Sequence, residues 1–272
     1  MTALLSGPEI SRRCAPGAAH VSIEVVAQTG STNADLLARL DTLPGPTLLL
    51  AAHQTAGRGR AGRSWLSAPG ATLTFSLAWK LQGPLARLAG LPLAVGVILA
   101  ECLARLDLPV QLKWPNDVLR DGAKLGGILI ETRGAQGQGI WAVIGIGINL
   151  LLPQHLETHI GRAVADAPWL AQMDRHQLMA ILASALADGL AEFDGAGFAA
   201  FSARWNGLHA HQGQSVTLTE QGRLLHEGRA AGVDELGRLL LDTAGGRLEI
   251  VSGDVTLRAS QFGNLGMNAC YC

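Results

Sequence analysis

The stretch AGRGRAGRSW, residues 56–65, concentrates positive charge and backbone freedom in one short segment. It interleaves three arginines with three glycines: Arg58, Arg60, Arg63, Gly57, Gly59 and Gly62. No Asp or Glu occurs between Asp41 and Glu101, so nothing nearby in the sequence neutralises it. Guanidinium groups bind phosphate and carboxylate through paired N–H donors, and glycines let the backbone approach a ligand closely. The stretch therefore favours a loop that wraps a small anion, with a solvated surface loop as the alternative.

Two other interpretations of the same stretch are weaker. Gly57-x-Gly59-x-x-Gly62 has the letters of the dinucleotide-binding fingerprint, but that fingerprint needs a helix after its last glycine and an acid about 20 residues further on. Here the chain runs through Arg63-Ser64-Trp65 toward Pro69-Gly70 and another strand, and the acid is missing. Arg-Gly segments that bind nucleic acid recur in polar stretches, whereas this one occurs once between two apolar strands.

Three further motifs place polar residues at the ends of predicted strands. KWPNDVL (113–119) offers Lys113, Asn116 and Asp117 around a proline turn, AKLGGILIE (123–131) offers Lys124 before two glycines, and IGIGIN (144–149) ends in Asn149. Each has an ordinary structural explanation: a plain turn, a solvated lysine, and a strand packed closely against a helix. Strand ends gather polar groups around pockets, so together the motifs favour one binding site.

The elements that must position these residues alternate without a strict βαβ order, which favours an α+β fold: a mixed β-sheet with helices packed on one side. Strands are predicted within 20–30, 46–54, 71–81, 110–114, 126–132 and 139–150, and helices over 31–40, 87–106, 174–193 and 198–205. Residues 73, 75, 77 and 79 alternate as in a half-buried strand. The segment 115–122 is predicted as a turn. From about His209, short alternating strands separated by turn residues predict a small barrel.

Composition limits the class of protein. The 272 residues are 48% hydrophobic and carry a net charge of −1, which predicts a sizeable core and argues against binding of bulk polyanions. The run from Leu88 to Ala100 is predicted to be too short to cross a membrane. Four irregularly spaced cysteines, two of them in a terminal Cys-Tyr-Cys, predict neither a disulfide framework nor a metal site. We expect a cytoplasmic protein.

From about residue 22 to 258, the chain resembles the biotin–protein ligases, in the catalytic region of the BirA type. The resemblance rests on STN (31–33), HQTAGRGRAGRSW (53–65), KWPNDV (113–118), KLGGIL (124–129) and GIGINL (145–150), in that order. It implies the fold shared by lipoate and biotin ligases, which is similar to class II synthetases, followed by a C-terminal SH3-like β-barrel. We expect a leader (1–20), a catalytic domain that binds biotin and ATP (21–208), the SH3-like domain (209–260) and a disordered tail (261–272).

The resemblance implies a reaction and a site. Biotin's carboxylate attacks Mg-ATP to give biotinyl-5′-AMP and pyrophosphate, and a carrier lysine then takes the biotinyl group. The implied catalytic residues are Arg60, Lys124 and Asp117. Those implied for biotin are Ser31, Thr32, Asn33, Gln54, Gly57, Arg58, Gly59, Arg60, Lys124 and Gly127. Those implied for the nucleotide are Arg58, Arg63, Trp65, Lys113, Asn116 and Asn149. No fixed metal site is implied; Mg²⁺ arrives with ATP, near Asp117.

The implied partner is the biotin carboxyl carrier domain of acetyl-CoA carboxylase or a similar enzyme, and a homodimer is compatible with the sequence. Because no helix-turn-helix precedes the first strand, we expect a monofunctional ligase that binds no DNA operator and no membrane. Two rival functions stay open: a sensor that has lost catalysis, and a ligase for another acid such as lipoate. A dithiolane ring offers no donors or acceptors to match Gln54 and the Ser-Thr-Asn triplet, which disfavours lipoate.

Overall fold

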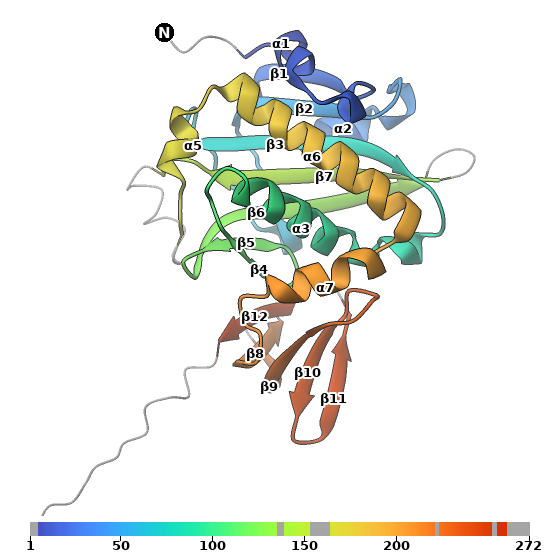
Figure 1. Cartoon of the computed structure of the whole chain (residues 1–272), viewed down its shortest axis with the longest axis vertical. Helices are drawn as coiled ribbons and strands as arrows, with labels where there is room; N and C mark the ends of the chain where they lie inside the picture. Colours follow the sequence, from blue (N-terminus) through green and yellow to red (C-terminus); the bar gives the residue numbers. More distant parts are fainter. Residues whose placement is uncertain (1–4, 135–138, 153–163, 221–222, 252–254, 260–272) are drawn as a thin grey trace, which may run out of the picture.

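The computed structural model describes residues 5–134, 139–152, 164–220, 223–251 and 255–259. Its larger sheet has seven strands in the order β1-β2-β3-β7-β6-β5-β4 (Figure 1). Their bounds are β1 (Ser22–Thr29), β2 (Thr47–Gln54), β3 (Thr72–Leu81), β4 (Gln111–Lys113), β5 (Asp117–Arg120), β6 (Ala123–Gly134) and β7 (Ile140–Asn149). Strands β1 and β2 pair in parallel, and every other neighbouring pair is antiparallel. The predicted mixed sheet is confirmed.

Two long helices cover one face of this sheet, α3 (Leu91–Ala104) and α6 (Arg175–Ala196) (Figure 1). The shorter helices are α1 (Gly7–Arg13), α2 (Thr32–Ala38), α5 (Pro168–Gln172) and α7 (Ala199–Gly207). Helix α2 differs from α3 and α6, because it packs on the opposite face over a separate apolar cluster that includes Leu36, Leu49 and Val143. The predicted packing of helices on one side is confirmed for α3 and α6 and for α1 and α7, which contact them, and α2 is the exception.

Both faces of strand β3 are buried. Leu73, Phe75, Leu77 and Trp79 point into the main core under α3 and α6, as their alternation predicts. The polar residues between them are buried too, with Ser76 fully inaccessible to solvent. The half-buried interpretation was wrong, because α2 and the pocket described below cover the second face.

The predicted helix over 87–106 is a 3₁₀ segment, Leu85–Gly90, followed by α3. Together they reach a length and apolarity compatible with a membrane span, contrary to the sequence expectation, although 67% of an 18-residue apolar stretch within them is buried inside the protein. Helix α3 is apolar on nearly all sides because the sheet, α6 and α7 contact it. This is the pattern of a central core helix.

Helices α1 and α5 and strand β5 escaped the sequence analysis. Helix α1 lies in the supposed leader and contacts β1 and α6, with Ile10 fully buried; seven residues with so few apolar positions give little periodic signal. Strand β5 lies inside the supposed turn. Asp121 and Gly122, with φ of 50° and 77°, make the tight turn from β5 into β6. An Asp-Gly pair is a strong hairpin signal, so this strand was predictable.

The smaller sheet is antiparallel, in the order β11-β10-β9-β8-β12: β8 to β11 form the predicted meander, and β12 returns to pair with β8. Its strands are β8 (Ser215–Glu220), β9 (Arg223–Val233), β10 (Leu239–Thr243), β11 (Gly246–Ile250) and β12 (Val255–Ala259). The segment that precedes it is joined to β4 of the larger sheet, where Leu112 exchanges backbone hydrogen bonds with Leu208 and Ala210. Buried Trp114 donates through Nε1 to Gly237 O at 3.2 Å. The predicted domain limits stay a proposed division, and the tail 261–272 lies outside the described residues.

Candidate active site

A pocket lies on the sheet face opposite α3 and α6, beside the start of α2. Two cross-strand rows form its floor: Thr74, Gly147 and Gly127 in one, and Ser76, Gly145 and Leu129 in the other. The open space above this floor is about 900 Å³, including solvent at its mouth. The predicted site residues that line it are Ser31, Thr32, Asn33, Gln54, Arg58, Gly59, Arg60, Arg63, Trp65, Lys113, Asn116, Asp117, Lys124 and Gly127.

The glycine–isoleucine alternation of β7 has a clear structural reason. Its isoleucines point into the main core, and its glycines point into the pocket. A Cβ on Gly145 would lie 2.3 Å from Asn33 Oδ1, and one on Gly147 would lie 2.4 Å from the Trp65 ring. The two glycines therefore make room for pocket side chains, not for a closely packed helix.

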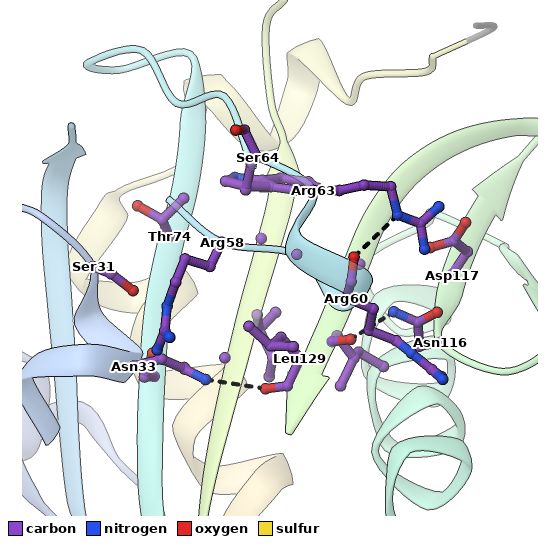
Figure 2. Close-up of a pocket in the computed structure, with 18 of the residues that line it drawn as sticks. Ser31, Asn33, Arg58, Arg60, Arg63, Ser64, Thr74, Asn116, Asp117 and Leu129 are labelled. Carbon is purple, nitrogen blue, oxygen red and sulfur yellow. Dashed lines mark hydrogen bonds between the residues drawn. The ribbon is translucent and has the colours of Figure 1, made fainter. Parts of the chain in front are cut away.

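The arginine-rich stretch folds into a narrow hairpin over this floor (Figure 2). Arg58 and Ser64 form an antiparallel bridge, Gly59 N donates to Arg63 O at 2.6 Å, and Trp65 N donates to Gly57 O at 2.9 Å. Ala61 and Gly62 turn the chain with φ of 53° and 71°. The hairpin directs the Arg58 side chain toward Asn33 and the Arg60 side chain toward Asn116 (Figure 2). The stretch is thus a wall of a pocket, as the sequence favoured.

The end of the pocket at α2 is a connected set of polar groups. The side-chain Oε1 of Gln54 accepts from the Thr32 backbone N at 2.8 Å. The Thr32 and Ser76 hydroxyls lie 2.6 Å apart, and Ser76 Oγ donates to Asn33 Oδ1 at 2.6 Å. Asn33 Nδ2 donates to Glu131 Oε2 at 2.9 Å. Thr32, Asn33 and Ser76 are buried, so this end is preorganised to bind a compact polar group.

The expectation that the cations have no acidic neighbours was wrong. Arg58 pairs with Glu131 at 2.8 Å, and Lys124 pairs with Asp117. Glu131 is 73 positions from Arg58 and reaches it only through the fold, whereas Asp117 and Lys124 lie seven positions apart on the neighbouring strands β5 and β6. Positive charge nevertheless dominates, since five cations of the described residues line the pocket and Asp117 is the sole acid among the lining residues.

The contact between Lys124 and Asp117 follows from the sheet register. Asp117 pairs with Gly127 across β5 and β6, and a Cβ on Gly127 would lie 3.0 Å from Lys124 Nζ. Both side chains are largely buried, with 13% and 16% of their surfaces exposed. Lys124 also lies over the Trp65 ring, 5.8 Å from its centre. This geometry favours a role for Asp117 in orienting Lys124.

Two predicted residues do not line the pocket. The Asn149 side chain is buried behind it and donates to the backbone oxygens of Lys124 and Ala165, at 3.3 and 3.1 Å; it supports the segment that carries Lys124. Gly57 lies in the hairpin opposite Trp65, and a Cβ at this position would lie 2.4 Å from Trp65 O. A direct role for either residue in ligand binding stays a prediction.

The sequence analysis missed Ser76 and Glu131. Ser76 was hidden because the alternation of β3 draws attention to its apolar face. The partner face, with Thr72, Thr74 and Ser76 in succession, is the signal that would have found it. Glu131 gives no local signal, since only the pairing of β6 beside α2 brings it to Asn33. Among the described residues, no group of three His, Cys, Asp or Glu side chains could hold a metal ion.

Comparisons with known proteins agree with this geometry. Residues 24–149 match the model of the biotin/lipoate A/B protein ligase family, and residues 211–258 match the biotin protein ligase C-terminal domain. A biotin–[acetyl-CoA-carboxylase] ligase of Paracoccus denitrificans is 33% identical over 209 residues, 71% of this chain and 82% of that protein.

The bifunctional ligase/repressor BirA of Escherichia coli is 37% identical over 195 residues, 69% of this chain. That match spans 59% of the Escherichia coli protein, less than two thirds of its length. Among solved structures, the biotin protein ligase of Aquifex aeolicus in complex with biotin and ATP is similar with a TM-score of 0.72 and 29% identity. The match covers 88% of this chain and 99% of that one.

Proposed function

This chain belongs to the biotin protein ligase family, and from its pocket we propose that it activates biotin with ATP and transfers it to a carrier protein. In the first step, a carboxylate oxygen of biotin attacks the α-phosphorus of ATP, and pyrophosphate leaves to give biotinyl-5′-AMP. In the second, the amine of a carrier lysine attacks the biotinyl carbonyl, loses a proton and expels AMP. The carrier is a biotin carboxyl carrier domain, as the printed names of relatives suggest.

The observation that carries this proposal is the division of one pocket into a neutral polar end and a cationic end. The polar end at α2 offers the hydroxyls of Ser31 and Thr32 and the amide of Gln54, which suits the N–H and C=O groups of a ureido ring. The cationic end offers Arg58, Arg60, Arg63, Lys113 and Lys124. A ligand that spans both must be polar and uncharged at one end and anionic at the other.

The cationic end suits adenylation because the reaction joins two anions. Positive groups fixed before the substrates arrive stabilise the charge that develops on the phosphorane-like transition state. Lys124 is suited to the carboxylate and α-phosphate oxygens, since Asp117 holds its ammonium beside the floor. Arg60, on the hairpin, is suited to the same oxygens from above. Mg²⁺ enters with ATP and neutralises the departing pyrophosphate.

Trp65 supports a place for the nucleotide next to the hairpin. Its ring lines the pocket over Gly147, and its Nε1 is buried without a hydrogen-bond partner in the described part of the chain. A buried donor of this kind is satisfied when a ligand acceptor fills the space. Asn116, whose amide donates to Ile128 O at 2.7 Å, lies beneath Arg60 at the same end.

Pyrophosphate release tests the proposal directly. Purified protein with Mg-ATP is expected to release pyrophosphate when biotin is added and not when lipoate is added, and to label a carrier domain in the second step. Release with lipoate alone would assign the chain to the other branch of the family. No release with either acid would favour a sensor that retains the pocket without the chemistry.

We further propose that the ligase does not act as a repressor. This proposal predicts no biotinyl-AMP-dependent binding of operator DNA in a gel-shift assay, and a specific shifted band would contradict it. A cytoplasmic location, the absence of membrane contact and the homodimer also stay predictions. Fractionation of cells and the mass of the purified protein in solution test them.

A further inference from the structure

Glu131 does not itself line the pocket; it lies just behind the polar end, where it is the last member of the hydrogen-bonded series. One carboxylate oxygen, Oε2, accepts from Asn33 Nδ2 at 2.9 Å and from Arg58 NH2 at 2.8 Å. A carboxylate accepts hydrogen bonds and donates none. Because Glu131 only accepts, it determines which group donates in each of the other hydrogen bonds of the series.

The first consequence concerns Asn33. Its amide must turn its NH₂ group toward Glu131, which leaves Oδ1 facing Ser76 Oγ at 2.6 Å. The second NH₂ hydrogen points to Leu129 O, 3.4 Å away. Ser76 must therefore donate its single hydroxyl hydrogen to Asn33. Since Ser76 and Asn33 are buried, no bulk water offers an alternative partner.

The second consequence concerns Thr32. Its hydroxyl lies 2.6 Å from Ser76 Oγ and 3.1 Å from Gln54 Oε1, and its one hydrogen can serve only one of them. Because the hydrogen of Ser76 is committed to Asn33, the shorter contact requires Thr32 to donate to Ser76. Gln54 Oε1 then keeps the Thr32 backbone N–H as its partner and has a lone pair left over.

We propose that Glu131 sets the donor–acceptor polarity of the biotin pocket, so that Thr32 Oγ1 and Gln54 Oε1 are both presented as acceptors for N–H groups of the substrate ring. Glu131 is a positioning residue, acting through Asn33 and Ser76. The inference rests on the proposed function. It explains a preference for a ring with N–H donors over a ring with none, because only donors satisfy the two acceptors.

Glutamine at position 131 separates this role from mere packing. The amide of Glu131→Gln has nearly the same shape but can donate as well as accept, so Asn33 can turn over and the series can reverse. Thr32 then donates to Gln54, so the pocket no longer presents two acceptors that need N–H donors from the ligand. We expect the Kd for biotin, measured by calorimetry, to rise about tenfold. Glu131→Asp keeps an acceptor-only group and is expected to recover much of the affinity.

Two comparisons make the test specific. Glu24→Gln removes an ion pair of similar exposure, Glu24 with Arg39, and is expected to leave the Kd unchanged. Arg58→Gln removes the partner of Glu131 and leaves the carboxylate in place. A biotin analogue methylated on its ureido nitrogens lacks the N–H donors, so the preference for biotin over this analogue should shrink in Glu131→Gln and persist in Arg58→Gln.

The outcomes are distinguishable from a failure of the proposed function. If the unaltered chain binds biotin and Glu131→Gln binds it within twofold of the same Kd, the inference is wrong and the proposed function stands. Equal weakening by Glu131→Gln and Arg58→Gln, with the preference for biotin over the analogue unchanged, also overturns it, because the ion pair alone would explain the loss. An unaltered chain that binds no biotin overturns both proposals.

Discussion

Replacement of Lys124 by methionine removes the ammonium group while keeping an unbranched side chain of similar length. Loss of one preorganised charge donor typically raises a barrier by roughly 3–4 kcal/mol, which slows biotin-dependent pyrophosphate release about 100- to 1,000-fold. Biotin binding should fall far less, because the polar end of the pocket at α2 is unchanged. Lys80→Met, on β3 of the same sheet and outside the pocket, is the matched control.

A second effect of the same substitution has to be separated from the first. Lys124→Met leaves the Asp117 carboxylate, which is 16% exposed, without its partner. A mostly buried charge left unpaired costs roughly 1–3 kcal/mol of unfolding free energy. In the double variant Lys124→Met with Asp117→Asn, both charges are absent, so stability in urea should return toward that of the unaltered protein. Adenylation should not return with it.

The assay is therefore a pair of measurements on three variants. Pyrophosphate release at saturating ATP gives the chemical step, and urea unfolding gives the stability. A Lys124→Met protein that releases pyrophosphate within threefold of the unaltered rate would refute the assigned role. A double variant that regains both stability and rate would show that Lys124 acts only by neutralising Asp117.

Three further predictions follow from other contacts. Gly147→Ala places a Cβ 2.4 Å from the Trp65 ring, so the KM for ATP should rise several-fold with little change in biotin affinity, whereas an unchanged KM would remove Trp65 from the nucleotide site. Burial lowers the pKa of His209 from 6.5 to about 4, so the folded protein holds it neutral while the unfolded chain binds the proton. Stability should therefore be complete above pH 6.5 and fall by up to about 3 kcal/mol toward pH 4, and His209→Gln should flatten this part of the unfolding curve. Gln54→Ala removes the acceptor for Thr32, so the Kd for biotin should rise at least fivefold; equal losses for biotin and ATP would instead indicate a damaged fold.

Strong periodic patterns made most of the fold predictable. Strand β3 and helix α2 show apolar residues at every second or every third to fourth position, and β2 and α3 show continuous apolar runs, so all four were found. Helix α1 is too short for such a pattern. The buried second face of β3 was missed because the burial of Thr74 and Ser76 depends on what lies above them. A sequence states which residues alternate, and only tertiary packing decides whether both faces are covered.

The position of the candidate site was predictable from the sequence, but its electrostatics were not. Motif residues at strand ends do converge, because the antiparallel pairing of β5, β6 and β7 brings Asp117, Gly127 and Gly147 into one row. The electrostatics were not predictable from the absence of acids near the arginine-rich stretch. Glu131 lies 73 positions from Arg58, yet the two form an ion pair. Separation along the chain carries no information about charge pairing across a pocket.

That pairing changes the way in which the pocket attracts anions. Five lining cations face Asp117 in the wall and Glu131 just behind it, which leaves an excess of three positive charges for substrates. Each carboxylate also holds one long side chain in place, so less side-chain entropy is lost when substrate binds. Removing both acids would raise the net charge and the salt-sensitive attraction for ATP, but it would release Lys124 and Arg58 from their positions. Tighter ATP binding with slower adenylation in the Asp117→Asn, Glu131→Gln double variant is the signature of a site in which the geometry of the cations, and not their number, limits the reaction.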